Sequence, residues 1–370
     1  MRKVIGLLLV LLFAVVLVGC GDNGTLDPED QKIVLITDKG DITDKSFNQG
    51  AYEGVKAYAE ANDIEYGYLK PADATDADYI AAIEQAIADG ATIIVTPGFL
   101  FEPAINAVQA DYPNVYFILL DGSPANVTDG TIEDNVYSVF YAEEQSGFLA
   151  GYAAVKDGYR KLGFMGGLAV PAVQRFGHGF VQGAAKAAEE LNLAANAVDI
   201  QYLYTGDFKA TPEVQAAAAT MFANGVEVIF ACGGAVGQSV MAAAATADAK
   251  VIGVDVDQSG DSDTVITSAM KNLAGSVEQA LEALFELGTW AEDFGGKSVV
   301  LDATRDGIQL PMATSEFTTF SQADYDAAFA KLVDGTYDVS SVIGAFGDDG
   351  TASEQFETTQ VQVTVILFEG

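Results

Sequence analysis

Cysteine and histidine are almost absent from this chain of 370 residues, which contains two cysteines and one histidine. Cys20 belongs to an N-terminal motif described below, so Cys232 has no partner for a disulfide within the chain. His178 has no second histidine with which to build the usual zinc sites, and no segment fits the D-x-[DN]-x-[DN]-G calcium loop. The glycine pairs fit neither G-x-G-x-x-G nor G-x-x-x-x-G-K-[ST]. The sequence therefore predicts no metal site and no cofactor.

Basic side chains are also scarce, because 18 lysines and arginines stand against 53 aspartates and glutamates, giving a formal net charge of −35. Nucleic acids and anionic membrane surfaces repel such a chain, so neither is expected as an electrostatic partner. Half of the residues are hydrophobic, which supplies a large core and excludes global disorder. The chain exceeds the size that one core usually supports, so two domains are expected.

The N-terminal residues have the order of a secretory signal. Arg2 and Lys3 precede an uncharged run from Val4 to Val18, and small residues follow at its end. The run is shorter than the roughly 20 apolar residues that span a bilayer. It is therefore interpreted as a leader and not as a membrane helix.

The Leu-Val-Gly-Cys ending of this run resembles the lipobox of bacterial lipoproteins, in which the cysteine becomes the lipid-bearing N-terminus. We therefore expect a lipoprotein signal peptide over residues 1–19, a lipid anchor at Cys20 and a flexible tether over 20–30. The protein would then be attached to the cell membrane on its extracytoplasmic side. The alternative is an ordinary secreted protein with an incidental cysteine.

From residue 31 onwards, short β-branched runs alternate with alanine-rich helical stretches. Such alternation predicts parallel sheets covered by helices on both faces, and the continuously apolar runs are typical of such buried strands. The strand candidates are 32–37, 92–96, 115–120, 162–166, 200–204, 226–231 and 250–254. The helix candidates are 50–62, 77–89, 104–111, 143–156, 177–191, 212–224, 237–247 and 275–287.

The predicted strands form two sets, which indicates an α/β fold with two doubly wound parallel-sheet lobes. The first lobe is expected over 31–138 with part of 270–310, and the second over 139–269 with part of 311–370. No linker rich in proline, glycine or serine separates the sets, so short hinge segments should join the lobes. Residues 344–370 match no pattern.

Polar and aromatic residues follow several predicted strands, at the ends where ligands collect in open α/β sheets. Phe47 lies in a polar loop after the first strand, and Phe176 lies at the start of a helix after the fourth. Asp121 and Asp255 follow two further strands. If the lobes face each other, the rings could hold a flat ring between them while the carboxylates accept hydrogen bonds from hydroxyl and amine groups. That is the chemistry of a nucleoside.

Each of these residues also has a structural interpretation. A single aspartate after a strand is often a turn or capping residue. Lys271, near an expected crossing between the lobes, either pairs with a carboxylate or donates to a ligand hydroxyl. His178 is expected to be structural because no nucleophile motif accompanies it. Cys232 is expected to be an inert buried thiol, since it lies between an apolar run and a glycine pair.

Five segments occur in the order shown by a known family: TDKGDITDKSFNQGAYEG, FILLDG, the Gly-Gly to Phe-Gly-His-Gly-Phe stretch, GVDVDQ and TSAMKN. Over residues 31 to 315 the chain thus resembles the basic membrane protein family, the lipoprotein substrate-binding components of nucleoside ABC transporters, which include a purine nucleoside receptor. The resemblance implies Asp38, Phe47 and Asn48 in the first lobe's share of the cleft, Asp121 beside the base, Phe176 as the opposing ring, and Gly233 or Gly234, Asp255 and Lys271 around the ribose.

The resemblance also implies a fold of the type I periplasmic binding protein class and a function. The expected protein is a monomer that captures a nucleoside, a purine nucleoside in the first place, by hinge closure and passes it to the permease of an ABC importer. It is not expected to be an enzyme. Some relatives bind other ligands, so riboflavin or a sugar remains an alternative. Two further alternatives are a surface nucleoside hydrolase and a structural surface lipoprotein.

Overall fold

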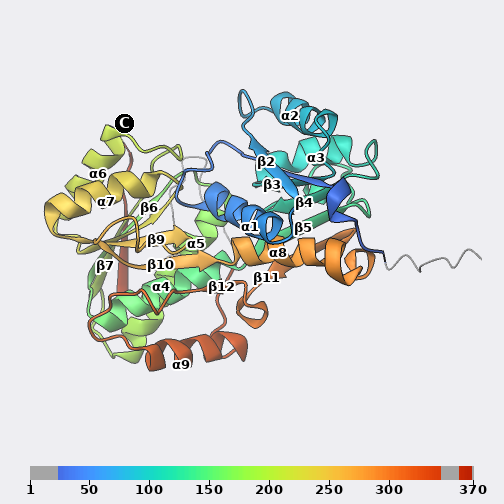
Figure 1. Ribbon diagram of the computed structural model, residues 1–370. Coiled ribbons are helices and arrows are strands. Elements are labelled where there is room, and N and C mark those ends of the chain that lie inside the picture. The colour runs from blue at the N-terminus through green and yellow to red at the C-terminus, as the bar shows by residue number, and fades with distance from the viewer. Residues whose placement is uncertain (1–23, 343–357, 369–370) are drawn as a thin grey trace, which may run out of the picture.

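The computed structural model describes residues 24–342 and 358–368, which form two lobes built on separate sheets (Figure 1). The first sheet has the order β11-β5-β4-β3-β1-β2 and is parallel throughout. The second has the order β12-β10-β9-β8-β6-β7-β13, in which only β12 is antiparallel to its neighbour. The strands are β1 Lys32–Ile36, β2 Glu65–Leu69, β3 Ile93–Pro97, β4 Tyr116–Leu120, β5 Val136–Tyr141, β6 Lys161–Gly166, β7 Val198–Tyr204, β8 Val228–Cys232, β9 Lys250–Asp255, β10 Val265–Lys271, β11 Lys297–Leu301, β12 Ile308–Gln309 and β13 Val361–Val365.

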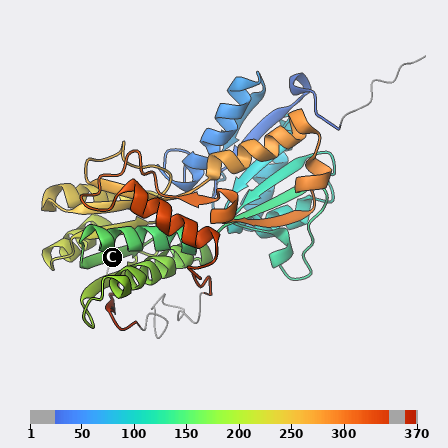
Figure 2. The ribbon, with the colours of Figure 1, turned by 90° about the horizontal axis from the view of Figure 1, so that it is seen from below.

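Helices cover both faces of each sheet (Figure 2). In β1, Ile33 and Leu35 pack with α1 and α8, whereas Val34 and Ile36 point to the other face and pack with α2 and α3. The helices are α1 Phe47–Ala61, α2 Asp76–Ala88, α3 Glu102–Val108, α4 Glu143–Asp157, α5 Pro171–Glu190, α6 Pro212–Ala223, α7 Val236–Ala247, α8 Leu273–Glu282 and α9 Gln322–Val333. Short 3₁₀ turns are η1 Pro28–Asp30, η2 Phe99–Phe101, η3 Pro124–Asn126 and η6 Ala303–Arg305, and π turns are η4 Ala283–Leu287 and η5 Trp290–Phe294.

The described chain passes between the lobes at three points: from β5 into α4, from β10 into α8, and between β11 and β12. Glu143 begins α4 and Lys271 ends β10, so both lie at crossings. The expected lobe boundary at residue 138 falls inside β5, all of which pairs in the first sheet. The first crossing therefore lies after Tyr141.

The α/β fold with two doubly wound lobes is confirmed, and each predicted strand is present near its expected position. The sequence interpretation missed β2, β5 and β10 to β13. Of these, β2, β11, β12 and β13 lie at or beside sheet edges, while β5 and β10 contain serine or threonine. Neither setting requires a continuously apolar run, which is the pattern that revealed the other strands.

Helix α5 begins earlier than predicted, and this changes the setting of Phe176. The predicted helix covered 177–191, whereas α5 covers Pro171–Glu190, so Phe176 lies within the helix and not in a loop. Its first residue is proline, which is favourable at that position because the missing N–H has no helical partner. Gly179 and Gly183 lie within both the predicted and the observed helix, and a Cβ at either would come within 1.9 Å of a carbonyl oxygen of α4. These glycines let the two helices pack closely.

The predicted signal peptide and Cys20 lie outside the described residues. The expected tether over 20–30 is wrong for its second half. The N–H of Leu26 donates to the carbonyl oxygen of Leu284 at 2.8 Å, and the Leu26 side chain packs against the core. The next residues form η1, which Asp27 caps. The apolar side chain of Leu26 gains burial by docking, so the chain is fixed to the first lobe from this point.

The C-terminal segment that matched no pattern supplies an edge strand. β13 pairs in parallel with β7 and completes the second sheet. Val361 is only 2 % exposed, and Ile366 and Phe368 pack against the core on the other face of the sheet. Residues 361–368 are therefore part of the folded second lobe.

Truncating Val361 tests this assignment. We expect Val361→Ala to lower the free energy of unfolding by about 1–3 kcal/mol, because it leaves a cavity in a closed core. Urea unfolding measures the change. Leu367→Ala, at a side chain that is 67 % exposed, is the control and should unfold like the parent. Equal stability of Val361→Ala and the parent would show that β13 does not belong to the cooperative unit.

Candidate ligand-binding site

A cavity of about 570 Å³ lies between the two lobes. Its wall comes from the carboxyl ends of strands in both sheets and from the loops that follow them. Ligands of open α/β sheets bind at such ends. The structure brings every predicted site residue together in this wall: Asp38, Phe47, Asn48, Asp121, Phe176, Gly233, Gly234, Asp255 and Lys271.

The loop before α1 fixes the first lobe's share of the wall. Asp44 accepts hydrogen bonds from the backbone N–H of Ser46 and from those of the first turn of α1. The side-chain amide of Asn48 donates to Asp38 Oδ1 at 2.9 Å and to Asp44 Oδ2 at 3.0 Å. Burial raises the pKa of Asp44 to about 6 despite these donors, and burial also raises the pKa of Asp38. Asn48 thus holds the Asp38 carboxylate in place.

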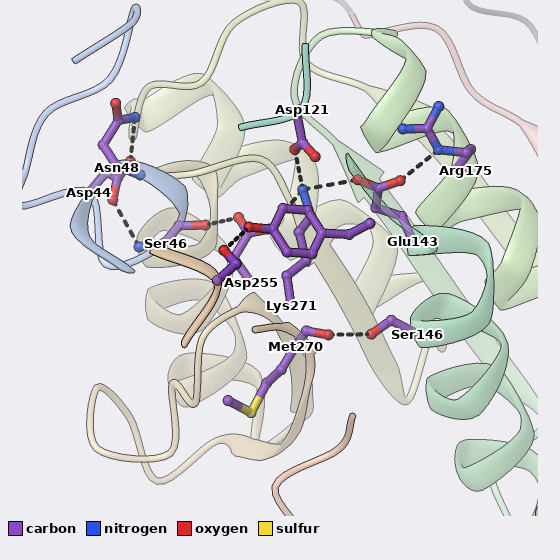
Figure 3. Close-up of polar contacts among 12 residues, drawn as sticks. Asp44, Ser46, Asn48, Asp121, Glu143, Ser146, Arg175, Asp255, Met270 and Lys271 are labelled. Carbon is purple, nitrogen blue, oxygen red and sulfur yellow. Dashed lines mark hydrogen bonds and ion pairs between the residues drawn. The ribbon is translucent and has the colours of Figure 1, made fainter. Parts of the chain in front are cut away.

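Two aspartates occupy equivalent places in the two lobes. Asp121 follows β4 and Asp255 ends β9, and both have left-handed backbone, with φ of 54° and 67°. This conformation costs roughly 1–2 kcal/mol for a residue with a side chain, and it persists where the surroundings fix it. Both carboxylates face Lys271, whose Nζ lies 2.5 Å from Asp121 Oδ2 and 3.6 Å from Asp255 Oδ1 (Figure 3). The strained backbone therefore aims both acids at one cation.

Lys271 is the centre of a buried group of charges, the lysine cluster, which also includes Asp121, Asp255, Glu143 and Arg175 (Figure 3). Its ammonium lies 3.2 Å from Oε1 of Glu143. The other oxygen of Glu143 accepts a hydrogen bond from Nε of Arg175 at 2.6 Å. The cluster draws on the first lobe, the second lobe and two of the crossings. It therefore ties both halves of the cavity wall together.

The lysine cluster holds three carboxylates against two cations. Burial raises the pKa of Asp121 to about 7, although the charge of Lys271 opposes this. Burial would also raise the pKa of Glu143, but Lys271 and Arg175 outweigh it and hold that pKa below its usual value. The three carboxylates in turn raise the pKa of Lys271 against the effect of burial. The excess negative charge thus concentrates on the aspartates, where it favours a proton or a ligand donor.

The oxygen Oδ1 of Asp121 is buried and has no hydrogen-bond partner among the described residues. Buried polar atoms are rarely left in this state, and each such atom requires an explanation. Because Asp121 lines the cavity, its free oxygen can accept a hydrogen bond from a bound ligand.

The predicted rings of Phe47 and Phe176 both lie beside the same ammonium, since Lys271 Nζ is 4.6 Å and 5.3 Å from their centroids. Phe176 is only 1 % exposed and packs edge-on against Phe230, with centroids 5.8 Å apart and planes at 84°. It forms part of the cavity floor. Its role as a stacking ring stays a prediction.

A third ring, Phe208, lines the cavity and was missed by the sequence interpretation. It is half-buried and follows β7 in a polar loop. A Cβ at Gly167 would come 2.4 Å from Phe208 Cδ1, so that glycine makes room for the ring. This setting resembles that of Phe47, which follows a polar stretch after a strand, although Phe47 itself is the first residue of α1. The repeated pattern was the signal that could have identified it.

The predicted glycine pair shapes the wall behind this ring. A Cβ at Gly233 would come 2.7 Å from the backbone nitrogen of Gly167, and Gly234 has a positive φ of 55°. Glu143 and Arg175 were also missed. They lie inside or at the start of helices, with no local motif, and only the fold brings them to Lys271.

His178 and Cys232 are both buried. Burial raises the pKa of the Cys232 thiol and lowers that of His178 to about 4, so the predicted burial of Cys232 is confirmed, while its inertness stays a prediction. Within residues 24–342 and 358–368, no group of three or more His, Cys, Asp or Glu residues is placed to hold a metal ion. Among the same residues, no helix has the length and apolar character of a membrane span.

Two lobes joined by three crossings, with a cavity of buried carboxylates and rings between them, define a two-lobed solute-binding protein. The fold is similar to that of an ABC transporter solute-binding protein from Aeropyrum pernix, with a TM-score of 0.70 and 21 % identity over 83 % of this chain and 92 % of that one. The likeness establishes the type I periplasmic binding protein fold.

The sequence relationships give the family. The model of the Bmp family, described as ABC transporter substrate-binding protein PnrA-like, matches residues 31–338, so this chain belongs to that family. A relative from Lactococcus lactis, named ABC transporter nucleoside-binding protein BmpA, is 30 % identical over 85 % of this chain and 93 % of its own length. A CD4+ T-cell-stimulating antigen from Listeria innocua is 29 % identical over 90 % and 96 % of the two chains. The expected resemblance is therefore confirmed, and the chain is an ABC transporter substrate-binding protein.

Asp121→Asn tests the excess charge of the lysine cluster. Asparagine keeps the shape, tolerates left-handed backbone and removes a carboxylate whose pKa is raised from 3.8 to about 7. Between these pH values the folded parent retains a proton that the unfolded chain has released, so the stability of the parent falls as the pH rises. From pH 5 to pH 8, we expect the free energy of unfolding of the variant to rise by about 1–3 kcal/mol relative to that of the parent.

Urea unfolding at both pH values measures this difference. Asp248→Asn is the matched control, because Asp248 has the same backbone conformation, with φ of 53°, but is exposed. A constant or decreasing gain for Asp121→Asn would show that the cluster carries no excess charge.

Proposed function

We propose that this chain is the nucleoside-binding component of an ABC importer and that its ligand is a purine nucleoside. The observation that carries the proposal is the cavity wall, in which rings from both lobes stand beside a buried carboxylate with an unpartnered oxygen. The name of the Lactococcus lactis relative supports the ligand class.

The base is assigned to the space between Phe47 of the first lobe and Phe208 of the second. Aromatic side chains bind nucleobases by stacking on their flat faces. Phe47 and Phe208 are half-buried and line the cavity, whereas Phe176 offers little exposed surface. Phe176 then contacts the base from the floor. Asp121 accepts a hydrogen bond from a base N–H through its free oxygen.

The ribose is assigned to Asp255, Lys271 and the glycine pair. Ribose hydroxyls donate to carboxylates and accept from ammonium groups, so one aspartate beside one lysine satisfies a diol. Gly233 and Gly234 allow the ligand to approach the backbone closely. Asp38, held by Asn48, supplies a further acceptor on the first lobe.

The charge of the wall supports a nucleoside over a nucleotide. A phosphate group would meet more carboxylates than cations, and repulsion in a poorly hydrated cavity is strong. The acidic residues of the wall are Asp38, Asp44, Asp73, Glu102, Asp121 and Asp255, and the basic ones are Lys39, Arg175 and Lys271.

Binding in this proposal works by hinge closure. The ligand contacts both lobes only when they are together, so it shifts the population towards the closed form. The protein acts as a monomer, is held by lipid on Cys20 at the extracytoplasmic face of the membrane, and delivers its ligand to a permease. No bond of the ligand is made or broken.

Thermal unfolding with candidate ligands tests the proposal on the Cys20→Ser protein. Purine nucleosides should raise the melting temperature, because a ligand at 100 times its Kd adds about 2.7 kcal/mol of stability. Ribose, arabinose and nucleotides should not. A higher melting temperature with riboflavin or a sugar alone would show that the ligand is not a nucleoside. Release of free base from inosine would indicate a hydrolase.

The two-ring assignment has its own test by calorimetry. Phe47→Ala and Phe208→Ala should each weaken nucleoside binding by about 1–3 kcal/mol. Phe208→Ala should leave the free protein nearly as stable as the parent, whereas Phe176→Ala should cost about 3–5 kcal/mol of stability because its ring is fully buried. If Phe208→Ala bound nucleoside as tightly as the parent, Phe176 and not Phe208 would be the second stacking ring.

The anchor is tested separately in cells. The parent should incorporate labelled fatty acid and sediment with membranes, whereas Cys20→Ser should do neither and should appear in the soluble extracytoplasmic fraction. Membrane retention of Cys20→Ser would overturn the anchor without bearing on the ligand.

A further inference from the structure

The lobes also meet outside the cavity, where the loop before α1 contacts the loop after β9. Ser46 Oγ donates to Asp255 Oδ2 at 2.5 Å (Figure 3). Gln258 Nε2 donates to the carbonyl oxygen of Lys45 at 2.6 Å. The ammonium of Lys45 lies 3.2 Å from Asp261 Oδ1. These contacts of Lys45 and Ser46 with Asp255, Gln258 and Asp261 are called the interlobe clasp below.

The two central side chains of the clasp are buried where the lobes meet. Ser46 is 0 % exposed and Gln258 is 1 % exposed, and neither belongs to the cavity wall. A ligand in the cavity therefore does not touch them. When the lobes part, each bond across the clasp is exchanged for bonds to water, so the clasp contributes to the closed form alone.

Gln258 is oriented by its own lobe before it meets the other one. Its side-chain oxygen Oε1 accepts a hydrogen bond from the backbone N–H of Val254 at 3.0 Å, and its backbone N–H donates to Ser268 Oγ at 3.1 Å. The remaining amide hydrogen points at Lys45 of the first lobe. A donor held in this way loses little freedom when the lobes close.

The backbone on both sides of the clasp is strained. Lys45 has φ of 60° and Asp255 has φ of 67°, in the left-handed region that residues with side chains rarely adopt. Beside them the lobes approach so closely that a Cβ at Gly50 of α1 would lie 2.6 Å from Val256 Cγ1. Residues with strained backbone cluster at ligand clamps and switch regions, which is the setting proposed next for the clasp.

We propose that the interlobe clasp locks the closed form and that Ser46 and Gln258 are positioning residues that set how long the ligand stays. The proposal rests on the hinge closure described above and not on the identity of the ligand. Asp255 belongs both to the cavity and to the clasp, because Oδ1 faces Lys271 and Oδ2 accepts from Ser46. The clasp therefore reaches the ligand through one shared carboxylate.

Two variants each remove one hydrogen bond of the clasp. Ser46→Ala deletes the hydroxyl that donates to Asp255. Gln258→Glu keeps an oxygen for the N–H of Val254 and replaces the donor facing Lys45 with a carboxylate oxygen. Ser276→Ala is the matched control, since that buried hydroxyl contacts Tyr141 at 2.6 Å within the first lobe.

The first measurement uses the thiol of Cys232, which is buried in the cavity wall and is the one remaining cysteine of the Cys20→Ser protein. Its rate of alkylation by a maleimide, without ligand, reports how often the lobes open. Ser46→Ala and Gln258→Glu should raise this rate roughly 5- to 30-fold, whereas Ser276→Ala should not, even though it lowers stability against urea.

The second measurement is the dissociation rate of inosine by stopped flow, which should rise by a similar factor with little change in the association rate. Unchanged alkylation and dissociation in both clasp variants would overturn the proposal, as would an equal increase in Ser276→Ala. If inosine does not bind at all, the proposed function fails while the alkylation rates still decide the clasp.

Discussion

The buried ammonium of Lys271 is the interaction on which the rest of the site depends. Its chain position, at the end of β10 and directly before the crossing into α8, places one cation between two lobes. Burying a charge costs several kcal/mol unless partners repay it, and here the partners come from β4, β9 and the start of α4. Buried ion pairs give little net stability compared with apolar packing. The lysine cluster is therefore better understood as a device that fixes geometry: it makes the relative position of the lobes depend on polar groups that a ligand can also reach.

The two lobes contribute to this device in the same way, and the repetition explains much of the site. Each supplies one aspartate at the end of a central strand, in left-handed backbone, and one aromatic ring that lies in or directly after the polar loop following a strand. The two rings are Phe47 and Phe208. Since both sheets present their carboxyl ends to the same cavity, a residue pattern that is unremarkable in either lobe becomes a pair of acceptors and a pair of faces when the lobes meet.

The parts of the fold and site that could be predicted are those with a local signal. Strands buried on both faces are recognisable as apolar runs. Asp121 and Asp255 stand at the ends of such runs, and Phe47 follows the polar loop after another. Edge strands such as β2 and β13 need no such run and were missed. The predicted start of α5 was six residues too late, because the helix begins at Pro171, a residue that a helix tolerates only in its first turn. Glu143 and Arg175 carry no local signal, because their partner lies on a distant segment of the chain. The roles of the clasp residues Ser46 and Gln258 could not be predicted for the same reason.

Because basic residues are scarce, the few that are buried determine how the charge of the site is balanced. The chain has 18 lysines and arginines, three of which line the cavity, and two of these three, Lys271 and Arg175, belong to the lysine cluster with its three buried carboxylates. One acid therefore lacks a full counter-charge, and a ligand rich in N–H and O–H donors can satisfy it without bringing charge. Asp255 extends this logic beyond the cavity. One of its oxygens faces the cation and the other accepts from Ser46 of the opposite lobe. A donor bound at Asp255 thus orients the carboxylate that the clasp requires, so recognition and closure depend on a single side chain.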